Sequence, residues 1–162
     1  MIRSLVFLLA LGFTLPLFAQ TRMDAGVFLG QQGYENVSDD PRLLPGVELM
    51  LRRDPWNVQL ALEYADLTQQ SGLFTTHANV LYRWKLGERF ALLAGAGATY
   101  LFSETESGRF TGNASGELAY DAGRIEMFAR VRSFDFDYSG FRVHSSPSGP
   151  AFYLGARFQI AE

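Results

Sequence analysis

Apolar and polar residues alternate with a period of two through two neighbouring segments, 56–64 and 74–85. One face of the first segment carries only apolar and aromatic side chains: Trp56, Val58, Leu60, Leu62 and Tyr64. Successive side chains of a strand point to opposite sides, so the pattern predicts strands with one apolar and one polar face. Aromatic residues stand at the ends of both segments, which is typical of an apolar face that contacts lipid.

The same alternation predicts eight strands in all, with no helical periodicity between them. We expect them at 23–30, 46–53, 56–64, 74–85, 90–102, 110–121, from 125 onward, and at 151–160. Polar links at 31–45, 66–72, 103–109 and 139–150 alternate with short links at 53–55, 86–89 and 121–124. An even number of strands with alternating long and short links predicts an all-β, eight-stranded antiparallel up-and-down transmembrane β-barrel.

Two positions interrupt this regular pattern. Gly95 and Gly97 fall on the inward face of the fifth strand, where we expect either large neighbours in a narrow interior or a sharply coiled sheet. In the seventh strand, aromatic residues from Phe134 onward fall in the phase of the charged residues. A bulge near Ser133 would restore the register, or these aromatic residues lie beyond the bilayer.

The first 19 residues have the organisation of a secretory signal peptide. Arg3 precedes an uncharged apolar stretch, and Ala19 offers a cleavage site. This stretch is shorter than the ~20 residues that a membrane-spanning helix needs. We therefore expect a cleaved signal at 1–19 and one barrel domain at 20–162.

Composition narrows the classes of function. Without Arg3 the chain has a formal charge of about −4 at neutral pH, and it has no basic patch for nucleic acid. The absence of Cys excludes disulfides and thiolate chemistry. We expect no cofactor and no metal, because His77 stands alone on its face and Asp39 with Asp40 fits a solvated turn.

A soluble eight-stranded carrier of the lipocalin kind is the main structural alternative. Its apolar faces would point inward to a ligand and its charges outward. Aromatic residues at strand ends and the alternating link lengths favour the membrane barrel instead.

The whole chain after residue 19 resembles the small outer-membrane β-barrels of Gram-negative bacteria, of the OmpA and OmpX type. The resemblance is carried by the alternation in every strand, by the glycine-rich strand around 94–98, and by the closing segment 153–158. It implies an outer-membrane location, contact with membrane lipid and lipopolysaccharide, insertion by the barrel-assembly machinery, and a monomer.

The alternation also assigns residues to the two faces of the barrel. The charged residues that we expect in the lumen are Asp24, Glu48, Arg52, Glu63, His77, Arg83, Glu117, Glu126, Arg130, Arg132 and Arg157. The aromatic residues that we expect in the interfacial girdles are Trp56, Tyr64, Phe74, Trp84, Phe90, Tyr100, Phe102, Phe110, Tyr120 and Phe152. An eight-stranded interior is only wide enough for side chains, so we expect paired charges rather than a wide pore.

An enzymatic function is the alternative to a structural or surface-interaction role. His144 and Ser146 precede the last predicted strand and are similar to the His-x-Ser pair of the lipid A deacylases, in which His activates Ser for attack on an ester. Those enzymes carry a later acid that orients the His, whereas the only acid after Ser146 here is Glu162. The sequence therefore favours a non-enzymatic envelope protein whose external partner is unknown.

Overall fold

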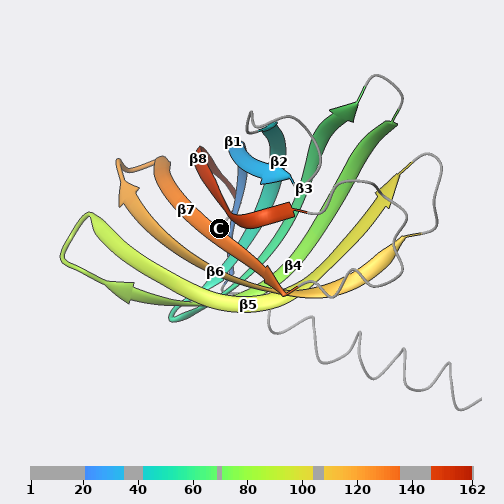
Figure 1. Ribbon diagram of the computed structural model, residues 1–162. Helices are drawn as coiled ribbons and strands as arrows, with labels where there is room; N and C mark the ends of the chain where they lie inside the picture. The colour runs from blue at the N-terminus through green and yellow to red at the C-terminus, as the bar shows by residue number, and fades with distance from the viewer. Residues whose placement is uncertain (1–20, 35–41, 69–70, 104–107, 136–146, 162) are drawn as a thin grey trace, which may run out of the picture.

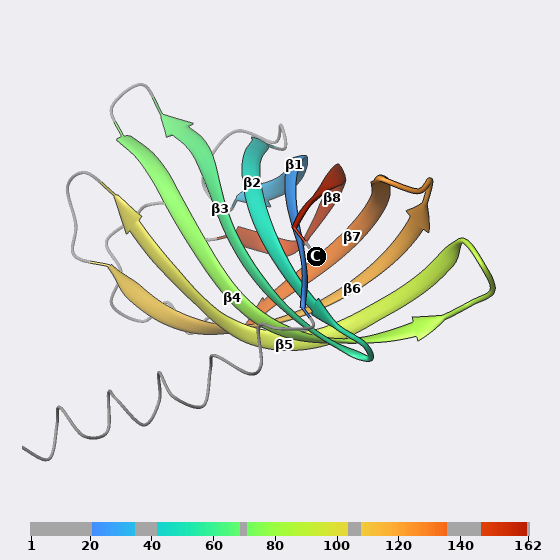
Figure 2. The same cartoon turned by 180° about the vertical axis from the view of Figure 1, so that it is seen from behind.

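The chain forms a closed barrel of eight antiparallel strands in the computed structural model (Figures 1 and 2). The structure describes residues 21–34, 42–68, 71–103, 108–135 and 147–161. Its strands are β1 (Arg22–Tyr34), β2 (Arg42–Arg53), β3 (Trp56–Thr68), β4 (Ser71–Lys85), β5 (Phe90–Ser103), β6 (Arg109–Asp121), β7 (Ile125–Asp135) and β8 (Pro147–Ala161). Within these ranges no helix is long and apolar enough to cross a membrane. The predicted fold class is confirmed.

Each strand pairs with its sequence neighbours, and β1 pairs with β8 to close the sheet. The short turns after β2, β4 and β6 lie at one end of the barrel, on the left in Figure 1. Gly87 and Gly123 have φ angles of 112° and 93° in two of these turns, a conformation that favours glycine. We call this end the short-turn end.

The predicted strands are too short at the opposite end. Residues 31–45 were expected to form a loop, but β1 continues to Tyr34 and β2 begins at Arg42. Pro45 fits within β2 because it pairs with Leu29 of β1, whereas the pairing of β2 with β3 begins only at Gly46. No ladder hydrogen bond toward β3 is therefore lost at the proline.

The β3–β4 connection is also shorter than predicted, and both ends of the predicted β7–β8 loop are displaced, because β7 ends at Asp135 and β8 begins at Pro147. The expected link at 66–72 is mostly strand, since only residues 69–70 separate β3 from β4. The alternation of long and short links therefore fails at this hairpin. β8 begins at Pro147, inside the expected loop at 139–150, because it pairs with the end of β1 beyond a register shift.

The predicted bulge near Ser133 is absent from the pairing of β7 with β6. The register continues without a shift from Arg132 through Ser133 to Asp135. Register shifts occur instead between β1 and β8 and between β3 and β4. Phe136 and Tyr138, which belong to the same prediction, lie outside the described residues.

The polar faces of the strands point into the barrel and the apolar faces point outward. Asp24, Asn57 and Arg132 are fully buried, whereas Phe110 and Leu154 are 78% and 69% exposed. A water-soluble protein rarely exposes so continuous an apolar surface, but a lipid-facing barrel requires one. The soluble carrier with an apolar interior is therefore wrong.

Gly95 and Gly97 lie where β5 approaches the backbone of β4. A Cβ atom at Gly95 would overlap the carbonyl oxygen of Val80, and one at Gly97 would overlap that of Ala78. The nearest neighbour of each glycine is a backbone oxygen, although the side-chain oxygen of Asn79 also lies close to Gly97. The sharply coiled sheet therefore explains these glycines better than large side chains in the interior. Figure 2 shows the strong curvature of β4 and β5.

We predict that Gly97→Ala lowers the free energy of unfolding by about 1–3 kcal/mol or more, because the backbone of β4 must move to admit the methyl group. The matched control is Gly116→Ala on β6, where the nearest heavy atom to an added Cβ is 3.8 Å away. Urea unfolding in lipid vesicles measures both variants. An equal loss of stability in the two variants would contradict the close approach of the β4 backbone to Gly97.

Candidate functional site

The charged residues predicted for the lumen lie inside the barrel and contact one another. Their acids come from β1, β2, β3, β6 and β7, and their arginines from β2, β4, β7 and β8. The five acids are Asp24, Glu48, Glu63, Glu117 and Glu126, and the five arginines are Arg52, Arg83, Arg130, Arg132 and Arg157. Buried charges need partners, and here the two signs are equal in number.

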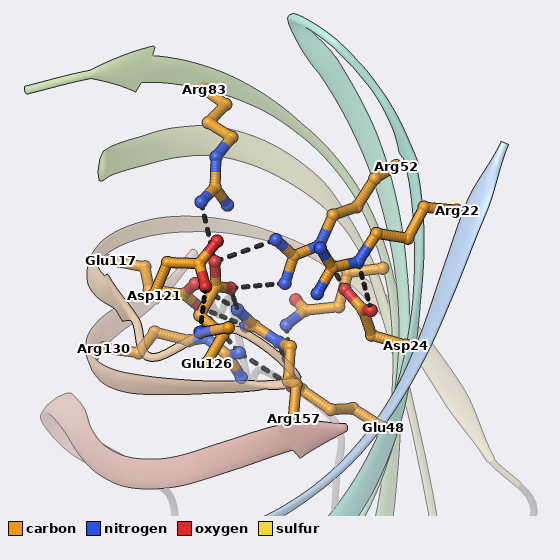
Figure 3. Close-up of polar contacts among 12 residues, drawn as sticks. Arg22, Asp24, Glu48, Arg52, Arg83, Glu117, Asp121, Glu126, Arg130 and Arg157 are labelled. Atoms are coloured by element: carbon orange, nitrogen blue, oxygen red, sulfur yellow. Dashed lines mark hydrogen bonds and ion pairs between the residues drawn. The ribbon is translucent and has the colours of Figure 1, made fainter. Parts of the chain in front are cut away.

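Arg157 of β8 lies at the centre of this network and contacts three carboxylates (Figure 3). It donates from Nη1 and Nη2 to Glu117 at 2.6 and 2.5 Å, and from Nη1 to Glu126 at 2.8 Å. Its Nε donates to Glu48. One guanidinium therefore joins strands β2, β6, β7 and β8 across the interior.

Arg130 of β7 makes a second bridge between Glu48 and Glu117. Its Nη2 lies 2.7 Å from an oxygen of each carboxylate, and its Nε donates to Glu117 at 2.9 Å. Phe128 packs against both central arginines, with its ring centre 4.5 Å from the guanidinium carbon of Arg130 and 4.1 Å from that of Arg157. Such cation–π contacts stabilise cations that have left water.

A second group of charges lies toward the short-turn end. Arg52 donates to both oxygens of Glu126 at 2.8 and 2.6 Å, and Arg83 donates to Glu126 at 2.7 Å. Arg52 also forms an ion pair with Asp24. Arg22, at the rim, donates to Asp24 at 2.8 Å. This group surrounds two carboxylates with several guanidinium groups.

A third group of polar side chains lies farther from the short turns, around Glu63. This carboxylate contacts Nε2 of His77 and accepts from Arg132 at 2.6 Å. The Nδ1 atom of His77 lies 2.9 Å from the hydroxyl of Thr99, which also accepts from Asn113 at 2.9 Å. His77 is therefore tied on both sides to neighbouring strands.

Sequence reasoning missed the neutral members of the network. Tyr153 places its ring 4.9 Å from the guanidinium carbon of Arg132. Gln59 links the network to β4, since it donates to Glu48 at 2.9 Å and accepts from Asn79 at 2.9 Å. All three residues fall in the inward phase of their strands, so this phase was the available signal.

The predicted girdle residues gather in two clusters on the outer surface. Near the short turns, Trp56 contacts Tyr82, Tyr82 contacts Trp84, and Phe90 contacts Tyr120, with ring centres 4.7–5.0 Å apart. Toward the other end, ring contacts connect Tyr64, Phe74, Phe102, Tyr100 and Phe110. Phe152 is exposed on the outer surface of β8.

The spacing of the two clusters matches the apolar part of an outer membrane. Phe74 and Trp84 are ten residues apart on β4, one in each cluster. That spacing is about 34 Å along a strand, which becomes a height of about 26 Å at a tilt of about 40°. Transmembrane barrels have an apolar band about 25 Å tall between aromatic girdles.

The residues considered for an esterase or for a calcium-binding turn lie where the structure gives no description. His144 and Ser146, the residues of the esterase alternative, lie outside the described residues, as do Asp39 and Asp40. Among the described residues, no group of three or more His, Cys, Asp or Glu side chains could hold a metal ion. The esterase therefore stays a prediction from sequence alone.

Comparison with solved structures identifies small outer-membrane barrels. OprG from Pseudomonas aeruginosa matches with a TM-score of 0.63 and 11% identity, over 88% of this chain and 96% of that one. Neisserial surface protein A matches with a TM-score of 0.59 and 9% identity, over 86% and 97% of the two chains. Ail, the attachment invasion locus protein of Yersinia pestis, matches with a TM-score of 0.58, 9% identity and the same two coverages.

These likenesses establish the fold. The TM-scores of 0.58–0.63 show that this chain shares the closed eight-stranded fold of these outer-membrane proteins, and the identities of 9–11% show nothing beyond the fold. No family model matches the sequence, and no curated protein matches it.

We predict that Arg157→Met lowers the free energy of unfolding by about 3–5 kcal/mol, because it leaves three buried carboxylates without their shared cation. The control is Lys85→Met, which breaks an exposed ion pair with Asp54 and should change stability by about 0–1 kcal/mol. Urea unfolding in vesicles compares the two variants. A similar small effect for both would show that the central network does not stabilise the barrel.

Proposed function

We propose that this protein is a non-enzymatic outer-membrane barrel that supports the envelope or presents its outer end to a partner, and that it is not a pore for large solutes. The observation that carries the proposal is the paired charge network across the interior. Arg130 and Arg157 join Glu48, Glu117 and Glu126 from four strands, so paired side chains bridge the middle of the barrel.

An outer-membrane location is supported by the outer surface and by the fold. The exposed apolar side chains lie between two aromatic clusters, as a bilayer requires. The barrels that match this structure include outer-membrane protein OprG and Neisserial surface protein A. The signal peptide predicted at 1–19 supplies the export route that such a location needs.

A role at the cell surface is supported by the end of the barrel away from the short turns. The β3–β4 hairpin continues past the girdle pair Tyr64 and Phe74, with Ala65 opposite Leu73 and Thr68 opposite Ser71. In outer-membrane barrels the short turns face the periplasm and the other end faces outward. A strand pair that extends beyond the lipid can contact a partner outside the cell.

We predict that liposomes containing the protein retain a disaccharide as well as empty liposomes do. The experiment uses protein that is taken from the outer-membrane fraction and that migrates in its compact form when unboiled. This selection ensures that only the closed barrel is measured. The comparison variant replaces Glu48, Glu117, Arg130 and Arg157 with Ala together, which leaves the charges balanced and should increase ion conductance by opening the middle of the lumen. Disaccharide flux through the unaltered protein would refute the proposal.

A further inference from the structure

A cavity of about 590 Å³ opens at the short-turn end and is rich in basic side chains. Its lining comes from the ends of β1, β2, β4 and β6 and from the β2–β3 turn. Five lining residues are basic and two are acidic: Arg22, Arg52, Arg53, Arg83, Lys85, Asp54 and Asp121. Arg52 and Arg83 also belong to the balanced interior network. Without these two, the cavity has three basic and two acidic residues, so the mouth keeps an excess of one positive charge.

The two acids of the cavity already have partners. Asp54 forms an ion pair with Lys85 at 2.5 Å, and Asp121 accepts from the backbone N–H of Gly123 at 2.7 Å. Arg53 has no ion-pair partner within the ranges that the structure describes. The positive charge of Arg53 therefore remains available to a ligand.

Arg83 contributes a donor that the interior does not use. Its side chain is only 8% exposed, and Figure 3 shows it reaching from β4 toward Glu126, to which Nη2 donates at 2.7 Å. The Nη1 atom is buried and has no hydrogen-bond partner among the described residues. An unpaired guanidinium donor in a low-dielectric site favours an anion.

We propose that this cavity binds a phosphate ester. Several guanidinium groups from different strands suit a phosphate ester, because its non-bridging oxygens accept hydrogen bonds from the planar fork of Arg. Arg53 lies opposite Trp56 in the β2–β3 register, so the mouth is level with the aromatic cluster and hence with lipid headgroups. The expected source is the headgroup of an anionic phospholipid in the adjacent leaflet.

The test is calorimetric titration of the folded protein in a neutral maltoside detergent at low salt. One arm uses dihexanoyl phosphatidylglycerol below its micelle concentration, and the other uses inorganic phosphate. Saturable binding of the lipid alone supports a headgroup site, and binding of both supports a site for free phosphate as well. The absence of saturable binding in both arms would overturn the proposal.

Matched variants assign the binding to the cavity. Arg53→Gln together with Arg83→Gln should weaken affinity about tenfold or more, because two charged donors are lost. Arg124→Gln removes one positive charge from the exposed β6–β7 turn at the same end, as Arg53→Gln alone does in the cavity. It should change affinity less than twofold, because an exposed surface charge contributes little. Equal weakening by Arg124→Gln would mean general surface attraction and would overturn the site.

Arg53→Gln alone keeps the proposal testable if the double variant does not fold, as judged by its unboiled gel mobility. Arg53 is exposed and takes no part in the interior ion pairs, so this single change should leave the compact form intact. We expect it to weaken phosphate binding about threefold or more by removing one of the charged donors. Unchanged affinity in this variant would contradict the role of the cavity.

Discussion

Pairing of β1 with β8 is the interaction on which the rest of this structure depends. Each backbone N–H or C=O group that lies in hydrocarbon without a hydrogen bond costs several kcal/mol of free energy, so a sheet can cross lipid only when its two edges are joined. The β1–β8 ladder runs from Met23 opposite Ala161 to Tyr34 opposite Pro147, through two register shifts. Closure with eight strands leaves an interior that side chains fill, and that narrow interior is why the inward faces could become a charge network.

Closure of the sheet brings together the strands whose acids and arginines neutralise one another in the interior. Ion pairs in an interior stabilise it only when every charge finds partners in good geometry. Here Glu48, Glu117 and Glu126 share Arg157, and the ring of Phe128 covers the two central guanidinium groups. The partners come from strands that are far apart in sequence but adjacent or opposite in the ring, so the network holds the barrel in one shape.

The sequence predicted the two faces of every strand because the period-two pattern records which side meets lipid. The prediction failed at the outer ends of the strands, where Gln31, Gln32 and Asp66 are still paired with neighbouring strands. Beyond the apolar band both faces of a strand meet water, so alternation no longer distinguishes strand from loop. Of the two explanations for the aromatic residues from Phe134 onward, the bulge near Ser133 was wrong, because register depends on the neighbouring strand. Nor could the sequence assign Arg157 to its three acids, because that choice depends on the stagger between strands.

Tryptophan fluorescence tests the central claim, that the apolar faces meet lipid. The chain has two tryptophans, Trp56 and Trp84, both on the outer surface in the cluster near the short turns. In vesicles of brominated phosphatidylcholine, we predict strong quenching by bromines near the headgroup, weaker quenching by bromines at the chain ends, and little quenching by aqueous iodide. Strong iodide quenching without bromine quenching would contradict the central claim, because the tryptophans would then face water.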